Sequence, residues 1–330
     1  MRVLAGDVGG TKTSLALYEV EEGHQLEQLA LDSVPSQKFG SLDEIVRQFL
    51  AKHDVEVEWA SFGIAGPVRN GQARTTNLPW LVDASRLEDE VGFRRVWLLN
   101  DLEANAWGIG ALNEADFLVL SEGDPDPEGN AAIISAGTGL GQAGLYWDGE
   151  RHRPFASEGG HSDFAPNSDL EIDLLQYLKK HYEHVSWERV VSGMGLVNIY
   201  EFLVEHRHKP TPDWLSGEMH NSDAAAAISK AARADRCPVC SEALDMFVHL
   251  YGVEAGNHAL KIMATGGVYI GGGIAPRNLD RFREYTLMRG FWSKGRMESL
   301  MRTMPVKVIL NDRTALFGPA VFAASESGRP

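Results

Sequence analysis

Two glycine-rich turns in this chain have the residue types that bind phosphate groups. The first lies in Gly6-Asp7-Val8-Gly9-Gly10-Thr11 and the second in Gly137-Thr138-Gly139-Leu140-Gly141. Glycine lets a turn reach positive φ and leaves room for a ligand, and consecutive amides in such a turn form a concave site for an anion. We therefore predict that the two turns hold one polyphosphate, although either turn alone is also compatible with an ordinary hairpin.

The segment from Gly6 to Thr13 is close to a P-loop, the phosphate-binding pattern G-x-x-x-x-G-K-[ST]. It departs from that pattern at Thr11, where the P-loop requires glycine. A P-loop also opens a helix, whereas Leu15 and Leu17 alternate with other residues as in a strand. The first turn is therefore predicted to join two strands.

A carboxylate follows a buried strand in Val96-Trp97-Leu98-Leu99-Asn100-Asp101. Open α/β sheets bind their ligands at the carboxyl ends of strands, so Asn100 and Asp101 are candidate site residues. The alternative is that Asp101 only caps the helix that follows, because aspartate is a favoured N-cap residue.

Three further segments have residues that could line a cleft between domains. Glu158-Gly159-Gly160-His161 separates a carboxylate and an imidazole by two glycines, and its alternative is a plain turn. Glu188 in Ser186-Trp187-Glu188-Arg189 is a candidate ligand, unless it only complements the dipole of a helix. Gly271-Gly272-Gly273 could bind phosphate or simply connect a strand to a helix.

The composition limits the possible partners. The chain has 330 residues, of which 44% are hydrophobic, and this length leaves room for two domains. Its net charge of −15 argues against nucleic acid, whose phosphates require a basic surface. No apolar stretch reaches the length of a membrane span, and the chain runs directly into a predicted core strand rather than a signal peptide. We therefore expect a cytoplasmic protein without a membrane partner.

The elements that must position these residues alternate between strands and helices, which predicts an α/β fold. Ser41-Leu42-Asp43-Glu44 is a capping box that begins a helix. Pro319 fits a last helix at 315–324 only in its first turn. Strands are predicted at 59–65, 96–99 and 268–270, a loop at 66–80, and helices at 102–112, 172–182, 196–204, 224–234 and 239–263.

The two cysteines lie in Cys237-Pro238-Val239-Cys240 and are predicted to be structural. A redox pair of this spacing belongs after a strand in a thioredoxin-like unit, and a zinc site would need two more ligands. Pro238 instead suits the first turn of the helix that follows.

Taken together and in this order, the motifs resemble those of the bacterial ATP-dependent glucokinase family, within the hexokinase and actin-like ATPase superfamily. The related repressor–kinase family has a cysteine-rich zinc motif after its glycine-histidine segment, and no such motif follows His161, so the resemblance is to the zinc-free branch. Besides the two turns, the resemblance is carried by Gly63-Ile64-Ala65-Gly66-Pro67, Leu99-Asn100-Asp101, Glu158-Gly159-Gly160-His161, Ser192-Gly193-Met194-Gly195-Leu196 and Gly266-Gly267-Val268-Tyr269-Ile270-Gly271-Gly272-Gly273-Ile274.

The resemblance implies a two-domain α/β fold of the actin-like ATPase (ribonuclease H-like) type. The smaller domain would comprise residues 1–111 plus 312–330, and the larger domain residues 112–311. The implied activity is glucokinase, the ATP-dependent phosphorylation of D-glucose at its 6-hydroxyl and the entry step of glycolysis. The implied general base is Asp101, and glucose would be bound by Asn100, Asp101, Glu158, His161 and Glu188. ATP would be bound by Gly6, Asp7, Val8, Gly9, Gly10, Thr11, Gly137, Thr138, Gly139, Gly271, Gly272 and Gly273.

Mg²⁺ is expected to accompany ATP without a direct protein ligand, with Asp7 as an anchor through bound water. The family also implies a homodimer. Two alternatives stay open at this point. One is a kinase of this architecture for another hexose, and the other is a sugar sensor, which the acidic charge and the Asn100-Asp101 pair disfavour. The resemblance assigns no role to Lys12 or to residues 210–221.

Overall fold

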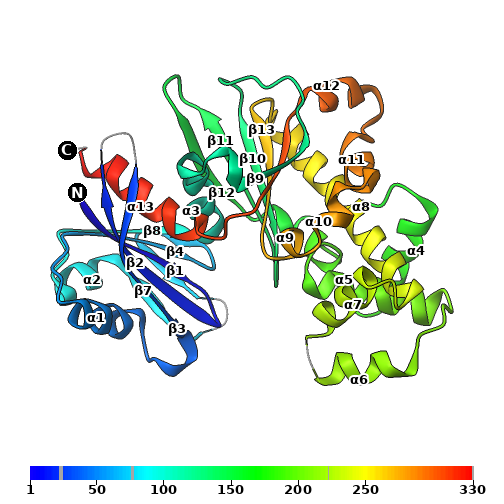
Figure 1. Ribbon diagram of the computed structural model, residues 1–330, viewed down its shortest axis with the longest axis horizontal. Coiled ribbons are helices and arrows are strands. Elements are labelled where there is room, and N and C mark those ends of the chain that lie inside the picture. Colours follow the sequence, from blue (N-terminus) through cyan, green and yellow to red (C-terminus); the bar gives the residue numbers. More distant parts are fainter. Residues whose placement is uncertain (22–24, 76–77, 222, 329–330) are drawn as a thin grey trace. The chain divides into compact units, whose positions relative to one another are not determined.

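The computed structural model describes residues 1–330 except 22–24, 76–77, 222 and 329–330. The chain forms two compact units, whose elements are labelled in Figure 1. The first unit contains Met1–Asp116, Arg153–Ala156 and Asn311–Pro330, and the second contains Phe117–His152 and Ser157–Leu310. The C-terminal segment thus belongs to the same unit as the N-terminal strands.

A sheet with the strand order β3-β2-β1-β4-β8 lies at the centre of the first unit. Strands β1, β2 and β3 are antiparallel neighbours, whereas β4 and β8 run parallel to β1. The parallel strands therefore end at one edge of the sheet, where Val8, Ile64 and Asn100 are neighbours in register. The strands of this sheet are β1 (Arg2–Val8), β2 (Lys12–Val20), β3 (Leu26–Pro35), β4 (Trp59–Ile64) and β8 (Arg95–Asn100).

Side chains on the two faces of this sheet belong to different cores, because successive residues of a strand point in opposite directions. Leu4 of β1 packs with helices α1 (Leu42–His53) and α2 (Ala84–Val91). Val3 and Ala5 pack instead with α13 (Thr314–Ser327). Helix α3 (Asp101–Gly108) lies beside α13 (Figure 1). The sheet is therefore covered by helices on both faces.

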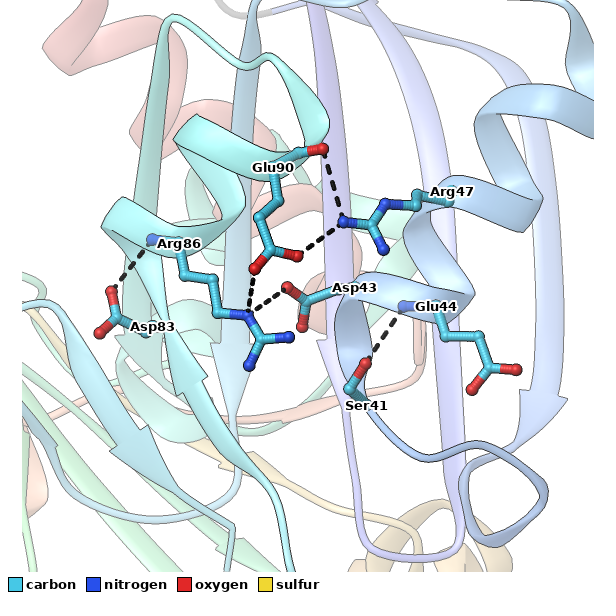
Figure 2. A network of polar contacts seen from close by, with 7 residues as sticks. All are labelled: Ser41, Asp43, Glu44, Arg47, Asp83, Arg86 and Glu90. Atoms are coloured by element: carbon cyan, nitrogen blue, oxygen red, sulfur yellow. Dashed lines mark hydrogen bonds and ion pairs between the residues drawn. The ribbon is translucent and has the colours of Figure 1, made fainter.

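Side-chain caps begin both helices of the α1–α2 face (Figure 2). Ser41 Oγ accepts a hydrogen bond from the Glu44 amide at 3.3 Å, and the Glu44 carboxylate accepts one from the Gly40 amide at 2.9 Å. These two bonds confirm the predicted capping box at the start of α1. Asp83 caps α2 by accepting a hydrogen bond from the Arg86 amide at 3.2 Å.

Ion pairs then connect α1 to α2 (Figure 2). The Arg86 Nε atom lies 3.4 Å from the Asp43 carboxylate, which is buried, and 2.9 Å from the Glu90 carboxylate, which is exposed. Arg47 of α1 reaches the same Glu90 at 2.7 Å. The Arg86, Arg47 and Glu90 side chains are exposed, and exposed ion pairs contribute little to the free energy of unfolding. We therefore infer that these pairs mainly align α1 with α2.

The predicted loop at 66–80 is wrong in part, because a small hairpin occupies its first half. Strands β5 (Val68–Arg69) and β6 (Gln72–Arg74) pair across Asn70 and Gly71, which both have positive φ. Strand β7 (Leu81–Asp83) pairs with β6. An Asn-Gly turn between two short strands is a hairpin signal, so the sequence contained the information that the prediction overlooked.

The prediction for Pro319 is also wrong, because the residue lies in the interior of α13 and not in its first turn. The helix approaches α3 so closely that a Cβ on Gly318 would meet the Ala104 carbonyl oxygen at 1.6 Å. Burial against α3 and the sheet thus outweighs the loss of the backbone donor at Pro319.

In the second unit, strands β11, β10, β13, β14 and β9 are neighbours in this order within one sheet. Strands β10, β13 and β14 are parallel, and β11 and β9 are antiparallel to their neighbours. The long helix α8 (Pro238–Ile262) packs its buried face on β10 and β13. These strands are β9 (Phe117–Ser121), β10 (Ala131–Ala136), β11 (Leu140–Trp147), β13 (Gly267–Gly271) and β14 (Val306–Ile309). Strand β12 (His152–Ser157) follows β11 along the chain, and its residues Arg153–Ala156 belong to the first unit.

Helices α4, α5, α7 and α8 confirm the helices predicted at 172–182, 196–204, 224–234 and 239–263, with shifted ends, and the other helices of the second unit lie outside these predicted ranges. Pro238 is the first residue of α8, as predicted, and the thiols of Cys237 and Cys240 are buried and free. These helices are α4 (Asp169–Leu178), α5 (Gly193–Glu201), α6 (Asp213–Asn221), α7 (Ala224–Arg233), α9 (Ile274–Arg277), α10 (Leu279–Arg283), α11 (Tyr285–Trp292) and α12 (Glu298–Thr303). Shorter helical turns of the second unit are η4 (Gly159–His161), η5 (Trp187–Arg189), η6 (Phe202–His206) and η7 (Gly295–Met297), and those of the first unit are η1 (Ser36–Lys38), η2 (Ile109–Ala111) and η3 (Glu114–Asp116).

These elements confirm the α/β class. Across the residues that the structure describes, no helix has both the length and the apolar character needed to cross a lipid bilayer.

Candidate active site

The first glycine turn joins β1 to β2 and is held from the side by Ser36. The Gly9 amide donates to the Lys12 carbonyl at 3.0 Å, which closes the turn. Ser36 donates its hydroxyl to the Gly9 carbonyl at 2.7 Å and its amide to the Thr11 carbonyl at 3.0 Å. Lys12 begins strand β2 and not a helix, so the exclusion of a P-loop is confirmed.

Asp7 lies near the end of β1, and its carboxyl group is only partly exposed. Burial, and to a smaller extent the negative charge of Asp101, raise the pKa of Asp7 to about 6, against the opposing effect of Lys12. A carboxylate that is destabilised by a second carboxylate attracts a cation, because a positive charge relieves both effects. The charges of Asp7 and Asp101 therefore act on each other within the first unit.

We expect the Asp7→Asn variant to gain stability relative to the wild type as the pH rises from 4 to 7. The folded pKa of about 6 exceeds the unfolded value of 3.8, so the folded state binds more protons between these values, and this contribution to wild-type stability is lost as the pH rises through 6. The difference in unfolding free energy should change by about 2 kcal/mol. Urea unfolding of both proteins at several pH values, without Mg²⁺, measures it.

Asp83→Asn is the matched control in the same unit. Hydrogen bonds from the Gln72 side chain and from the Arg86 and Ser85 amides hold the pKa of Asp83 below its usual range. The contribution of the Asp83 carboxylate to stability is therefore lost only below the range of pH 4 to 7. The difference in unfolding free energy between Asp83→Asn and the wild type should stay constant across that range. A constant difference for Asp7→Asn as well would contradict the shifted pKa.

Asn100 and Asp101 stand where β8 passes into α3. Asn100 is the N-cap of α3, because its Oδ1 atom accepts hydrogen bonds from the amides of Leu102 at 3.0 Å and Glu103 at 3.3 Å. The Asn100 amide nitrogen donates to the Gly66 carbonyl at 3.3 Å. The alternative in which Asp101 is the capping residue is therefore wrong.

Asp101 is the first residue of α3, and its Oδ1 atom accepts a hydrogen bond from the Leu102 amide at 2.9 Å. Strand β4 passes close beneath it, since a Cβ on Gly63 would lie 2.8 Å from the Ala104 Cβ atom and 3.8 Å from the Asp101 Cα atom. The absence of a side chain at Gly63 thus lets the start of α3 sit against the strand ends that also contain Asp7.

In the second unit the other two glycine turns lie side by side. Ser135, at the end of β10, pairs in register with Gly271 at the end of β13. Gly272 has φ of +79°, and a Cβ there would meet the Ala136 carbonyl oxygen at 2.2 Å. The turn after β10 is closed by a hydrogen bond from the Gly137 amide to the Gly139 carbonyl at 2.9 Å. The fold therefore brings together two glycine turns that are more than a hundred residues apart in sequence.

A buried tyrosine of α8 holds both turns at their bases. The Tyr251 hydroxyl accepts a hydrogen bond from the Ala136 amide at 2.9 Å. It lies 3.2 Å from the Ile134 carbonyl oxygen and 3.1 Å from that of Gly271, either of which can accept its proton. Burial raises the pKa of Tyr251 far above its usual value, so the hydroxyl stays protonated.

Glu188 connects the candidate sugar ligands of the second unit to its phosphate turn. Its Oε2 atom accepts a hydrogen bond from the Leu140 amide at 3.0 Å, and a Cβ on Gly139 would lie 2.5 Å from the same oxygen. Glu188 lies in the short turn η5, just before the N-cap of α5 at Ser192. The Gly193 amide adds a second connection by donating to the Gly137 carbonyl at 2.8 Å.

Glu158 and His161 are exposed at the two ends of η4. Their closest side-chain oxygen and nitrogen atoms are 4.0 Å apart. The Ser162 carbonyl that follows η4 accepts a hydrogen bond from the Trp187 amide of η5 at 3.0 Å. The second unit therefore gathers Glu158, His161 and Glu188 from two neighbouring turns.

The predicted site residues are thus divided between the two units. Among the residues that it describes, no three His, Cys, Asp or Glu side chains cluster as ligands of a metal ion. The first unit contains Gly6, Asp7, Val8, Gly9, Gly10, Thr11, Asn100 and Asp101, and the second contains Gly137, Thr138, Gly139, Glu158, His161, Glu188, Gly271, Gly272 and Gly273.

Comparison with known proteins defines the class first. The fold is that of the actin-like ATPase sugar kinases. A crystal structure of glucokinase from an Antarctic psychrotroph has a TM-score of 0.85 and 31% sequence identity, and the match covers 98% of this chain and 99% of that one.

The sequence comparisons then identify the family. The family model described as Glucokinase matches residues 4–326. Glucokinases of Nostoc punctiforme and of a Synechocystis strain are each 42% identical to this chain, with coverage of 98% and 97%, respectively, of both the chain and the relative. The chain belongs to the glucokinase family.

Sequence reasoning missed Tyr251, Gln142 and Glu254, which are buried in the second unit beneath its turns. Tyr251 and Glu254 are three residues apart in an otherwise apolar stretch of α8, so they share its buried face. Polar residues on the buried face of a helix were the signal that could have singled them out.

Proposed function

We propose that this chain transfers the γ-phosphoryl group of ATP to the 6-hydroxyl of D-glucose. Support comes from its glucokinase relatives and from Asp101, which begins α3 at the strand edge beside Asp7. In the proposed reaction the 6-oxygen bonds to the γ-phosphorus while the bond to the bridging β–γ oxygen breaks. ADP leaves, and the carboxylate of Asp101 takes the hydroxyl proton.

The proposed role of Asp101 follows from the weakness of an alcohol as a nucleophile near pH 7. A carboxylate within hydrogen-bond reach of the hydroxyl contributes roughly 10²- to 10⁴-fold to the rate. The Leu102 amide that donates a hydrogen bond to Asp101 Oδ1 fixes the orientation of the side chain. Asp101 is thus positioned as a base by the first turn of its own helix.

For the other hydroxyl groups of the sugar we propose Asn100, Glu158, His161 and Glu188 as hydrogen-bonding partners. A hexose that lacks a matching hydroxyl would leave such groups unpaired, which is how a strongly hydrogen-bonding site discriminates between similar substrates. For ATP we propose the three glycine turns. A Cβ on Gly137 or Gly273 would meet no described atom within 4 Å, so the backbone there is open to a ligand.

Mg²⁺ fits the residues of the first unit as an ion bound through phosphate and water. Asp7 is the carboxylate that would hold such an ion through a water molecule, because burial and then the charge of Asp101 raise its pKa and a cation would offset both effects. The ion would neutralise charge on the transferred phosphoryl group.

We also propose a homodimer, by family membership, and a cytoplasmic location.

The activity is tested with the purified chain, ATP, Mg²⁺ and a panel of glucose, fructose, mannose and glucosamine. Release of ADP, followed by a coupled assay, compares all four sugars. Glucose 6-phosphate dehydrogenase then reports whether glucose is phosphorylated at oxygen 6. We expect the highest kcat/KM with glucose. A higher value with another sugar would change the substrate, and no ADP release with any sugar would overturn the proposed activity.

A further inference from the structure

Behind the exposed turn η4 lies a buried chain of polar side chains that the proposed reaction does not use. Glu254 of α8 is fully buried, and Gln142 of β11 is 1% exposed. Gln142 Nε2 donates to Glu254 Oε1 at 2.7 Å, and Asn257 Nδ2 donates to Glu254 Oε2 at 3.0 Å. Lys294 Nζ in turn donates to Asn257 Oδ1 at 2.9 Å. Each carboxylate oxygen of Glu254 therefore has an amide donor.

This arrangement determines which way the Gln142 amide points. Because its nitrogen donates to Glu254, its oxygen faces the other way, toward η4. A Cβ on Gly159 would lie 2.2 Å from Gln142 Oε1 and 2.9 Å from Gln142 Cδ. Gly159 is the first residue of η4, directly after Glu158, and its amide donates to Ser157 Oγ at 3.0 Å. The Gln142 side chain thus supports the backbone between the two candidate sugar ligands Glu158 and His161.

We propose that Glu254, acting through Gln142, is a positioning residue for glucose recognition by the turn that contains Glu158 and His161. This inference rests on the proposed function. A buried carboxylate is costly unless its oxygens are satisfied, and here Glu254 has two amide donors and the cationic Lys294 nearby. Leucine or methionine would fill the same volume at lower cost, so the carboxylate is explained by the orientation that it imposes on Gln142.

The test variant is Glu254→Gln, which keeps the shape of the side chain but has only one acceptor oxygen. The side-chain amide of either Gln142 or Asn257 must then flip. If Gln142 flips, its NH₂ group replaces the oxygen next to Gly159. We expect the glucose Kd and KM to rise about 5- to 10-fold, the loss that follows from one disrupted hydrogen bond. The ADP Kd and kcat should stay close to the wild-type values. Calorimetric titration with glucose and with ADP, and steady-state kinetics, measure this split.

A reciprocal exchange supplies the rescue. In the double variant Gln142→Glu with Glu254→Gln, the new amide at 254 can donate to the new carboxylate at 142 and still accept from Asn257. The second oxygen of the carboxylate at 142 then faces Gly159, as the Gln142 oxygen does in the wild type. We expect the double variant to return the glucose Kd close to the wild-type value, a coupling that a double-mutant cycle quantifies.

Glu171→Gln is the matched control. Glu171 is also buried in the second unit, but its carboxylate oxygens contact the Asn167 amide at 2.6 Å and His249 at 3.7 Å. This variant should leave the glucose Kd unchanged. If Glu254→Gln does not fold, Gln142→Met removes the amide next to Gly159 while Glu254 keeps its bond to Asn257, and it should raise the glucose Kd to the same extent.

Three results would overturn the inference while the wild type binds and phosphorylates glucose. The first is an unchanged glucose Kd in Glu254→Gln, or in Gln142→Met if Glu254→Gln does not fold. The second is an equal rise of the glucose Kd and the ADP Kd. The third is a glucose Kd that is not restored in the double variant Gln142→Glu with Glu254→Gln. Failure of the wild type to bind glucose would instead overturn the proposed function, and the inference with it.

Discussion

Replacing Asp101 with asparagine should lower kcat by roughly 10²- to 10⁴-fold while glucose still binds. The asparagine side chain keeps an oxygen that can accept the hydrogen bond from the Leu102 amide, so the start of α3 should be preserved. The side chain can no longer take a proton from the sugar hydroxyl. Coupled assays give kcat, and calorimetry gives the glucose Kd of the same protein. Turnover near the wild-type rate would remove Asp101 from the role of general base.

Glu103→Gln is the appropriate comparison, because Glu103 lies in the same first turn of α3. Burial raises the pKa of its carboxyl group, so its environment is also partly desolvated. The site residues of the first unit do not include Glu103, and its amide is capped by the Asn100 side chain. We expect this variant to keep its turnover, which would show that the loss in Asp101→Asn is not a general effect of removing negative charge from the helix start.

Replacing Gly272 with alanine should both destabilise the second unit and weaken nucleotide binding. Gly272 has φ of +79°, a conformation that costs alanine about 1 kcal/mol. The new Cβ would also lie 2.2 Å from the Ala136 carbonyl oxygen and 2.7 Å from its carbon. Both are backbone atoms of β10, whose end is held by Tyr251, so no side-chain rotation can relieve the contact.

The turn after β13 and the turn after β10 must therefore separate in the Gly272→Ala variant. We expect a loss of about 3 kcal/mol in unfolding free energy, typical of a backbone clash at a special φ, and at least a tenfold rise in the ATP KM. Thermal unfolding and ATP titration measure the two effects. Wild-type values of both would show that the two glycine turns do not depend on their mutual contact.

Gly273→Ala serves as the control for stability. A Cβ at Gly273 would meet no described atom within 4 Å, and its φ of −78° suits alanine. The unfolding free energy should therefore stay within about 0.5 kcal/mol of the wild type. If both alanine variants lost the same stability, the cause would be the flexibility of glycine and not the contact with Ala136.

The parts of the fold that could be predicted were those determined by neighbouring residues in sequence. The capping box at Ser41 and Glu44 formed as expected, since its two hydrogen bonds join residues within one turn of a helix. The strand character on both sides of the first glycine turn followed from the alternation of apolar residues. Pro319 was misplaced because its effect depends on the packing of α13 against α3, which no local pattern contains.

The same distinction applies to the candidate site. The glycine turns and the Asn100-Asp101 pair were recognisable because phosphate-binding turns and strand ends are short local patterns. The assignment of the cap to Asn100 depended on side-chain geometry at a single helix start, and sequence left it open. Tyr251 and the Gln142–Glu254 pair act across more than a hundred residues of sequence, so they could be found only once β10, β11 and α8 had come together.

The amino-acid sequence by itself determined the family, the α/β class and the short motifs, because each depends on residue types at fixed local spacing. Only the tertiary structure decided that the turns after β10 and β13 touch, that Asp7 and Asp101 repel each other, and that a buried glutamate stands behind the turn of Glu158 and His161. Contact, burial and charge repulsion depend on distances in space, and folding sets those distances between residues that the sequence keeps far apart.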